Sequence, residues 1–186
     1  MSTGLVKGSL ADLAGTANLS LAESFLNVDA VLLVDMSGSM GVHDARGGRS
    51  RYDAAEDELR TLQAQFPGKV AVIAFSDQAE FCPTGVPIRM GGNTNLAAAL
   101  RFVKPVDGLA RVIVISDGEP DSESEALSVA RTFTSRIDVV YIGPEIGGSG
   151  REFLERLAKA SGGTFVSSDA PGLLADSVTL LLQASA

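Results

Sequence analysis

Short apolar runs that are continuous rather than alternating constrain the fold of this chain more than any other sequence feature. They are rich in Val and Ile, which is typical of strands buried on both faces of a parallel sheet. Stretches with apolar residues three or four positions apart, the spacing of amphipathic helices, separate them. This alternation predicts an α/β fold, a doubly wound, Rossmann-like three-layer sandwich with a mostly parallel sheet. We expect strands over 30–34, 70–75, 112–115, 139–142 and 164–166, and helices over 52–66, 96–103, 122–134, 149–161 and 173–182.

Two places break the alternation. Only three residues separate Phe75 from the next apolar residues, 79–82, which is too short a connection for a crossover helix. We therefore expect one short antiparallel strand at the edge of the sheet. Residues 8–25 are rich in Ala and Leu and precede the first strand, and we expect them to be helical and packed against the domain. The predicted organisation is an N-terminal helical extension, 1–27, followed by one domain, 28–186.

Composition and charge exclude several classes of function. The chain has 186 residues, of which 45% are hydrophobic, as in a globular protein of about one domain. It has 15 Lys and Arg against 23 Asp and Glu, a net charge of −8, so nucleic acid is a poor partner. We see no apolar run of about 18 residues and no signal-peptide pattern. We expect a cytoplasmic protein without a membrane partner, and the single Cys82 suits a reducing compartment.

Polar residues gather where three predicted elements meet the same edge of the sheet. One group, 35–41, follows the first strand; a second, 116–120, follows the strand at 112–115; and a third, 91–95, precedes a helix. In open α/β sheets, ligands bind at the carboxyl ends of the strands, where the strand order reverses. Two carboxylates on neighbouring strands repel unless a cation lies between them, and hard oxygen ligands suit Mg²⁺ or Mn²⁺. The candidate metal ligands are Asp35, Ser37, Ser39, Thr94 and Asp117.

These motifs resemble the metal ion-dependent adhesion site (MIDAS) of von Willebrand factor A (vWA) domains. The match consists of Asp-x-Ser-x-Ser from Asp35 to Ser39, Thr94 ahead of a helix, and Asp117 in Ser-Asp-Gly-Glu-Pro after a strand. The match covers residues 28–186, the predicted vWA domain. Within the family, the chain resembles compact, stand-alone vWA proteins of bacteria and phages more than large adhesins.

The resemblance implies a binding function rather than an enzyme. It implies that the three hydroxyl side chains bind the ion directly, and that Asp35 and Asp117 act through waters. The ion keeps an open position for an Asp or Glu carboxylate of a partner protein. Bacterial vWA proteins often work beside AAA+ ATPases or within multiprotein assemblies, so a partner of that kind is implied as well.

Other interpretations stay open. Taken alone, Thr94 is most simply a helix N-cap, and Ser37 to Ser39 is an ordinary turn. A Mg²⁺-dependent phosphohydrolase with Asp35 as nucleophile is one alternative function, although haloacid-dehalogenase-type enzymes have a second Asp where this chain has Ser37. A structural or assembly component of a phage or particle is another. The loop 41–51, with the only histidine, His43, is either a partner contact or a solvated loop.

Overall fold

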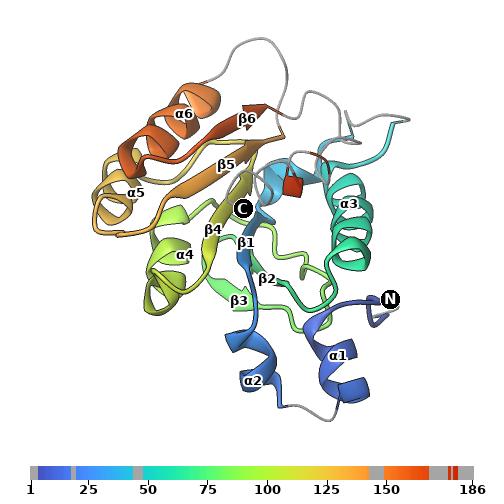
Figure 1. Ribbon diagram of the computed structural model, residues 1–186. Helices are drawn as coiled ribbons and strands as arrows, with labels where there is room; N and C mark the ends of the chain where they lie inside the picture. The colour runs from blue at the N-terminus through green and yellow to red at the C-terminus, as the bar shows by residue number, and fades with distance from the viewer. Residues whose placement is uncertain are drawn as a thin grey trace.

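A six-stranded sheet forms the centre of the computed structural model, which describes residues 4–17, 20–43, 48–142, 149–167, 176 and 178–179. The strand order is β3-β2-β1-β4-β5-β6 (Figure 1). Every neighbouring pair is parallel except β2 and β3, which are antiparallel. The α/β fold and the antiparallel edge strand are therefore confirmed. The strands are β1 (Ala30–Asp35), β2 (Val70–Phe75), β3 (Ala79–Phe81), β4 (Arg111–Ser116), β5 (Ile137–Tyr141) and β6 (Phe165–Ser167).

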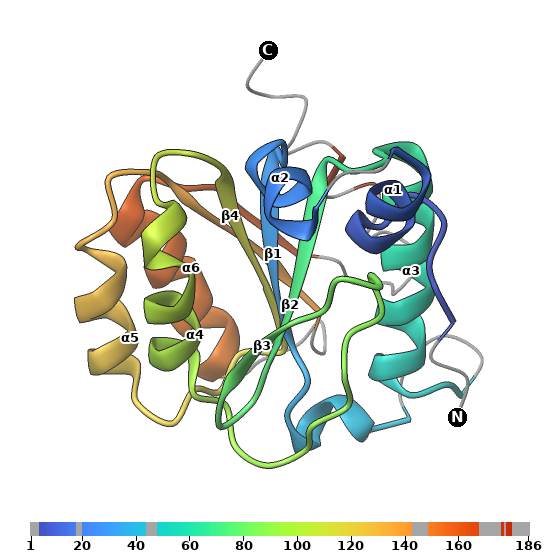
Figure 2. The same cartoon turned by 90° about the horizontal axis from the view of Figure 1, so that it is seen from below.

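Helices cover both faces of the sheet and give the molecule three layers. In Figure 2 the helices α4, α5 and α6 lie on one face, and α3 lies on the other with α1 beside it. The helical segments are α1 (Leu10–Ala17), α2 (Leu21–Leu26), the 3₁₀ turn η1 (Gly38–Gly41), α3 (Arg51–Gln65), α4 (Leu96–Val103), the 3₁₀ turn η2 (Lys104–Val106), α5 (Glu123–Ala130) and α6 (Ser149–Ser161).

The continuous apolar runs are explained by two separate cores. Along β1, Val31 and Leu33 belong to the core beneath α4, α5 and α6, while Leu32 and Val34 belong to the core beneath α3. All six residues of β1 are buried. A strand covered on both faces has no solvent-facing side, so its sequence does not alternate.

The strand order reverses between β1 and β4. The connection from β1 to β2 runs through α3 on one face of the sheet. The connection from β3 to β4 runs through α4 on the other face (Figure 2). The two strands are in register, with Val34 beside Ile115. Their carboxyl ends therefore open at the same point, which is the usual ligand position in a doubly wound sheet.

Two predicted helices differ from the structure or lie partly outside it. The helix expected over 122–134 is α5, which ends at Ala130. The carboxylate of Asp107 accepts hydrogen bonds from the N–H groups of Thr134 and Ser135, at 2.8 and 2.9 Å, and this directs the chain away from a helical path. Most of the helix expected over 173–182 lies outside the described residues, although Val178 is buried in the α3-side core.

The N-terminal segment packs against the rest of the chain. Val6 and Leu10 are buried, and the N–H groups of Val6 and Ala11 donate to the carbonyl groups of Thr84 and Pro83. On α2, Phe25 makes an edge-to-face contact with Phe81, with 5.4 Å between ring centroids. Within the described residues, no helix combines the length and apolar character that crossing a membrane requires.

Candidate metal site at the carboxyl edge

A cavity of about 450 Å³ lies at the carboxyl ends of β1 and β4. Its lining combines side chains from the loops after β1 and β4, from the segment before α4 and from the start of α3. Four of the five predicted metal ligands are among them. The lining residues are Ser37, Ser39, Val42, Arg51, Gly92, Thr94, Asp117, Glu119, Tyr141 and Gly150.

The loop after β1 places two serines side by side. Asp35 ends β1, and its Oδ1 accepts the N–H of Ser37 at 2.9 Å, which turns the chain sharply at this point. The 3₁₀ turn η1 follows directly. Ser37 Oγ and Ser39 Oγ are 3.1 Å apart, within hydrogen-bond distance of each other, and both residues line the cavity.

The loop after β4 adds a carboxylate to this pair. Ser39 Oγ donates to Asp117 Oδ1 at 3.1 Å, which links the two loops across 78 positions of sequence. Gly118 follows with φ of +106°, and a Cβ atom there would lie 2.6 Å from the backbone of Gly150. Only glycine fits this close approach, and it keeps the neighbouring Asp117 at the cavity.

The segment before α4 is held against the first loop by backbone hydrogen bonds. Gly38 N–H donates to Gly92 C=O at 3.0 Å, and Gly91 N–H donates to Met36 C=O at 2.9 Å. These bonds bring Thr94 to the same cavity. The N-cap of α4 is Asn95, whose Oδ1 accepts the N–H of Ala98. The interpretation of Thr94 as the N-cap is therefore wrong, and its hydroxyl group is not used for that purpose.

Asp35 differs from the other candidates because it is fully buried. Its donors are neutral: Ser37 N–H contacts Oδ1, and the Ser116 hydroxyl contacts Oδ2 at 2.6 Å. Burial raises the pKa of Asp35 to about 6, although the hydrogen bonds from Ser116 and Ser37 oppose the shift and the charge of Asp117 adds to it. Asp35 thus supplies negative charge from behind Ser37 rather than from the cavity wall.

A cation that we did not expect contacts the second carboxylate. Arg51 Nη1 lies 2.5 Å from Asp117 Oδ2, and the two side chains are only 12% and 6% exposed. Neither the Asp35 motif nor the Asp117 motif contains Lys or Arg, and the sequence placed Arg51 in a long loop. It is instead the first residue of α3, directly after the N-cap Ser50.

Tyr52 and Ser116 are two further residues that the sequence analysis did not assign to the site. The Tyr52 hydroxyl donates to the backbone carbonyl groups of Met36 and Ser37, and so ties α3 to the first loop. Ser116 Oγ donates to Asp35 and accepts the N–H of Gly118 at 3.0 Å. A tyrosine on an apolar helical stripe gives no signal of such a contact. His43 is exposed, and the loop residues 44–47 lie outside the described residues.

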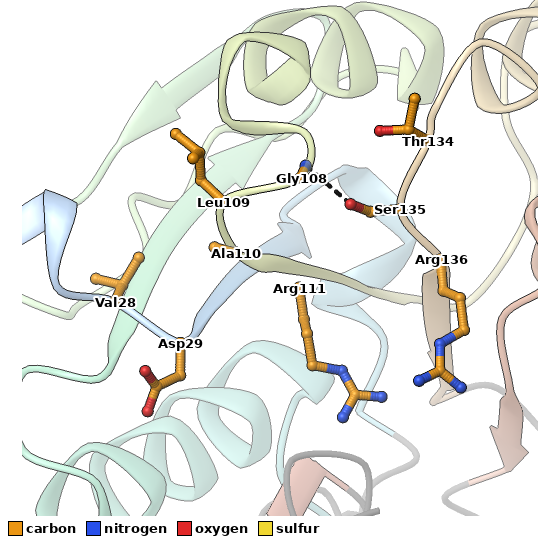
Figure 3. A pocket seen from close by; sticks show the side chains of 9 residues that line it. All are labelled: Val28, Asp29, Gly108, Leu109, Ala110, Arg111, Thr134, Ser135 and Arg136. Atoms are coloured by element: carbon orange, nitrogen blue, oxygen red, sulfur yellow. Dashed lines mark hydrogen bonds between the residues drawn. The ribbon is translucent and has the colours of Figure 1, made fainter. Parts of the chain in front are cut away.

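A second cavity, of about 510 Å³, lies where β1, β4 and β5 begin. We call this end of the strands the amino edge of the sheet. Figure 3 shows the side chains of Arg111 and Arg136 on one side of it and Asp29 on another. Arg111 donates to the fully buried carboxylate of Asp138 at 2.7 Å. Gly108 N–H donates to Ser135 Oγ at 2.8 Å, the bond that Figure 3 marks with a dashed line. The polar groups described here pair with one another, Arg111 with Asp138 and Gly108 with Ser135, and do not form a set of oxygen ligands around one point.

Comparison with known proteins places the fold in one class. No protein-family model and no curated protein matches the sequence. Among solved structures, an aerotolerance-related membrane protein from Bacteroides fragilis is similar, with a TM-score of 0.66 and 17% identity, covering 84% of this chain and 99% of that chain. A von Willebrand factor type A protein from Catenulispora acidiphila has a TM-score of 0.62 and 16% identity, covering 82% and 41%.

A third similar structure is the manganese-loaded TRAP protein of Plasmodium vivax, with a TM-score of 0.55 and 20% identity, covering 84% of this chain and 72% of that chain. The chain therefore has the vWA fold. Its site also has suitable chemistry for a divalent ion. No group of three or more His, Cys, Asp or Glu metal ligands occurs among the described residues, but three hydroxyl groups and Asp117 face one cavity, and hard oxygen atoms suit Mg²⁺ or Mn²⁺.

Proposed function

We propose that this protein is a divalent-metal-dependent interaction module that binds an Asp or Glu side chain of a partner protein at the carboxyl-edge cavity. One observation carries the proposal: oxygen atoms of Ser37, Ser39 and Asp117 form a chain with 3.1 Å between neighbours, and Thr94 lines the same cavity. The chain lies where the strand order reverses, which is the common ligand position in this architecture.

The residues divide into two roles. Ser37, Ser39 and Thr94 would hold Mg²⁺ or Mn²⁺ through neutral hydroxyl groups, while Asp35 and Asp117 would balance its charge. When bound, the ion would supply an electrophilic position for a carboxylate. The manganese-loaded state of the Plasmodium vivax structure supports a divalent ion in a protein of this fold.

The burial of Asp35 favours a binding module over a phosphohydrolase. A nucleophilic carboxylate must reach the substrate, but Asp35 is fully buried and both of its oxygen atoms accept hydrogen bonds. Its carboxylate would act on the ion through its charge and through the position of Ser37, not by attack on a substrate. We therefore propose that the protein is not an enzyme, and turnover of a generic phosphoester with Mg²⁺ would contradict this.

The first experiment is calorimetry of Mg²⁺ and Mn²⁺ binding, with thermal stability measured in parallel. Metal that binds only the folded state raises stability, by about 2.7 kcal/mol at 100 times its Kd. We expect Ser39→Ala and Thr94→Ala to lose this gain. Thr61→Ala is the matched control, because Thr61 is an exposed residue of α3 whose hydroxyl donates within the helix. Equal metal binding by Thr94→Ala and Thr61→Ala would contradict the proposed ligand set.

The second experiment identifies the partner. Candidate proteins, AAA+ ATPases first, are tested for binding with Mg²⁺ and again with EDTA. For any partner found, we expect binding to require both the metal and one acidic residue, so that Asp→Asn or Glu→Gln at that residue has the same effect as EDTA. A partner that binds equally well in EDTA would show that the metal is not part of recognition.

A further inference from the structure

Arg51 and Asp117 form one of the two least exposed ion pairs among the described residues. Among the ion pairs within the described ranges, only this pair and Arg111–Asp138 have both side chains less than a fifth exposed. Arg111–Asp138 lies at the amino edge, away from the proposed metal. Arg51–Asp117 lies in the metal cavity itself, with Arg51 Nη1 2.5 Å from Asp117 Oδ2.

The pair places a positive charge on the carboxylate that the metal site needs. Asp117 Oδ1 accepts the Ser39 hydroxyl and Oδ2 accepts the Arg51 guanidinium, so both oxygen atoms are engaged. A divalent ion beside Ser39 would lie within a few ångströms of a guanidinium that cannot lose its charge. Two cations at that separation repel strongly in a partly buried cavity.

We propose that Arg51 is the resident cation of this site, which a divalent metal ion must displace from Asp117 in order to bind. The inference rests on the proposed function and specifies how metal binding is regulated. Without metal, Arg51 neutralises Asp117 and keeps the ligands in place. With metal, the guanidinium leaves Asp117, so the observed affinity for metal is lower than the intrinsic affinity by the cost of breaking the pair.

A purely structural ion pair would behave differently. It would link the start of α3 to the loop after β4, and its loss would weaken the fold both with and without metal. Metal affinity would then stay constant or fall when Arg51 is removed. The resident-cation proposal requires the opposite, since removing a competitor strengthens binding.

Calorimetry of Mn²⁺ and Mg²⁺ binding to Arg51→Gln, Arg51→Lys and the wild type separates these two cases. We expect Arg51→Gln to bind metal about tenfold or more tightly, a coupling of the usual size between competing ligands. Arg51→Lys, which keeps the charge but not the planar fork, should fall between them. Arg60→Gln is the matched control and should equal the wild type, because Arg60 is on the same helix and pairs with Glu56 away from the cavity.

Each outcome decides one question. Equal or weaker metal binding by Arg51→Gln overturns the displacement while the proposed function stands. Absence of metal binding in the wild type and both Arg51 variants overturns the proposed function, and the displacement with it. A second measurement needs no variant: in ¹⁵N NMR of the wild type, saturating Mg²⁺ should shift the Arg51 guanidinium signals and speed their hydrogen exchange, and unchanged signals in the metal-bound protein would overturn the displacement.

Discussion

At the amino edge of the sheet, Asp107 accepts hydrogen bonds from Lys104 Nζ and from the N–H groups of Thr134 and Ser135, all within 2.9 Å. At the carboxyl edge, Asp35 accepts hydrogen bonds from the N–H of Ser37 and the hydroxyl of Ser116, both neutral. Burial opposes ionisation of Asp107, but its hydrogen bonds outweigh burial and hold its pKa well below the usual range. Burial dominates at Asp35 and raises its pKa to about 6.

The difference separates an edge whose carboxylate is compensated within the fold from an edge whose carboxylate is compensated only in part. Asp107 has a cation and two backbone donors of its own, so its charge stabilises the folded chain without any ligand. Asp35 carries a charge that neutral donors compensate only partly. An added cation in the neighbouring cavity would complete that compensation, which agrees with the metal site proposed here.

Asp107→Asn should have the largest effect on stability. The change removes the charge that Lys104 contacts and turns an amide N–H toward a backbone donor, so we expect a loss of about 2–3 kcal/mol. Urea denaturation in metal-free buffer measures it. Asp29→Asn is the control, because Asp29 forms an exposed pair with Lys69 and should change stability by less than about 0.5 kcal/mol. Similar losses of stability for the two variants would mean that Asp107 stabilises the fold no more than an exposed ion pair does.

Asp35→Asn tests the other side of the comparison. The amide can still accept the Ser37 N–H and can donate to Ser116 Oγ, and it removes a poorly compensated charge. Without metal at pH 8, we expect stability to stay equal or to rise by up to about 2 kcal/mol. Stabilisation by Mg²⁺ or Mn²⁺ should be lost. A variant that is strongly destabilised without metal would mean that the Asp35 charge already has its partner within the fold.

The dependence of stability on pH should have opposite signs at the two edges. The pKa of Asp35 is higher in the folded state, so its contribution is greatest below about pH 4 and declines as the pH rises through about 6. The pKa of Asp107 is lower in the folded state, so its contribution is present above about pH 4 and is lost at lower pH. Metal-free urea titrations at several pH values measure both effects.

The matched Asn variants isolate each contribution. Between pH 4 and pH 7, the free energy of unfolding of the wild type should fall by on the order of 1–2 kcal/mol relative to that of Asp35→Asn. Relative to Asp107→Asn, the wild type should gain stability as the pH rises through the range in which Asp107 ionises in the unfolded chain. A constant difference between the wild type and Asp35→Asn across this range would show that the carboxyl group of Asp35 ionises as it does in the unfolded chain.

The strands, and the position of the candidate ligands at the carboxyl ends of the strands, could be predicted from the sequence because both depend on local patterns. Apolar runs mark β1, β2 and β4, and motif residues placed directly after a parallel strand must reach its carboxyl edge. Four of those residues do line one cavity. Asp35 lies behind it, because the turn that the Ser37 N–H closes on Asp35 buries the carboxylate.

The contacts that the sequence could not predict join parts of the chain that no local pattern relates. Arg51 and Asp117 are 66 positions apart, and only the packing of α3 against the sheet brings them together. Asn95 rather than Thr94 caps α4 because the segment before the helix is fixed by Gly91 and Gly92. Similarly, the end of α5 depends on Asp107, which is more than 20 positions earlier in the chain.

Tyr52→Phe should give the smallest of these effects and shows how far the carboxyl edge depends on its support. The hydroxyl group holds the carbonyl groups of Met36 and Ser37 and so fixes the loop that carries both serines. Its loss should cost about 1 kcal/mol of stability, the usual net value of one hydrogen bond. Arg89 lies 5.5 Å from the Tyr52 ring centroid, and the phenylalanine ring keeps a face for it.

Metal affinity separates a supporting role of Tyr52 from a merely stabilising one. A loop that loses its fixed position should bind metal less tightly, by several-fold, in addition to the lost stability. Ser124→Ala is the control, since it removes an exposed hydroxyl group of α5 and should leave both values unchanged. If Tyr52→Phe lowers stability but leaves metal affinity intact, the serine loop is held by Asp35 and the backbone alone. In that case the two edges differ only in the charge that they leave uncompensated.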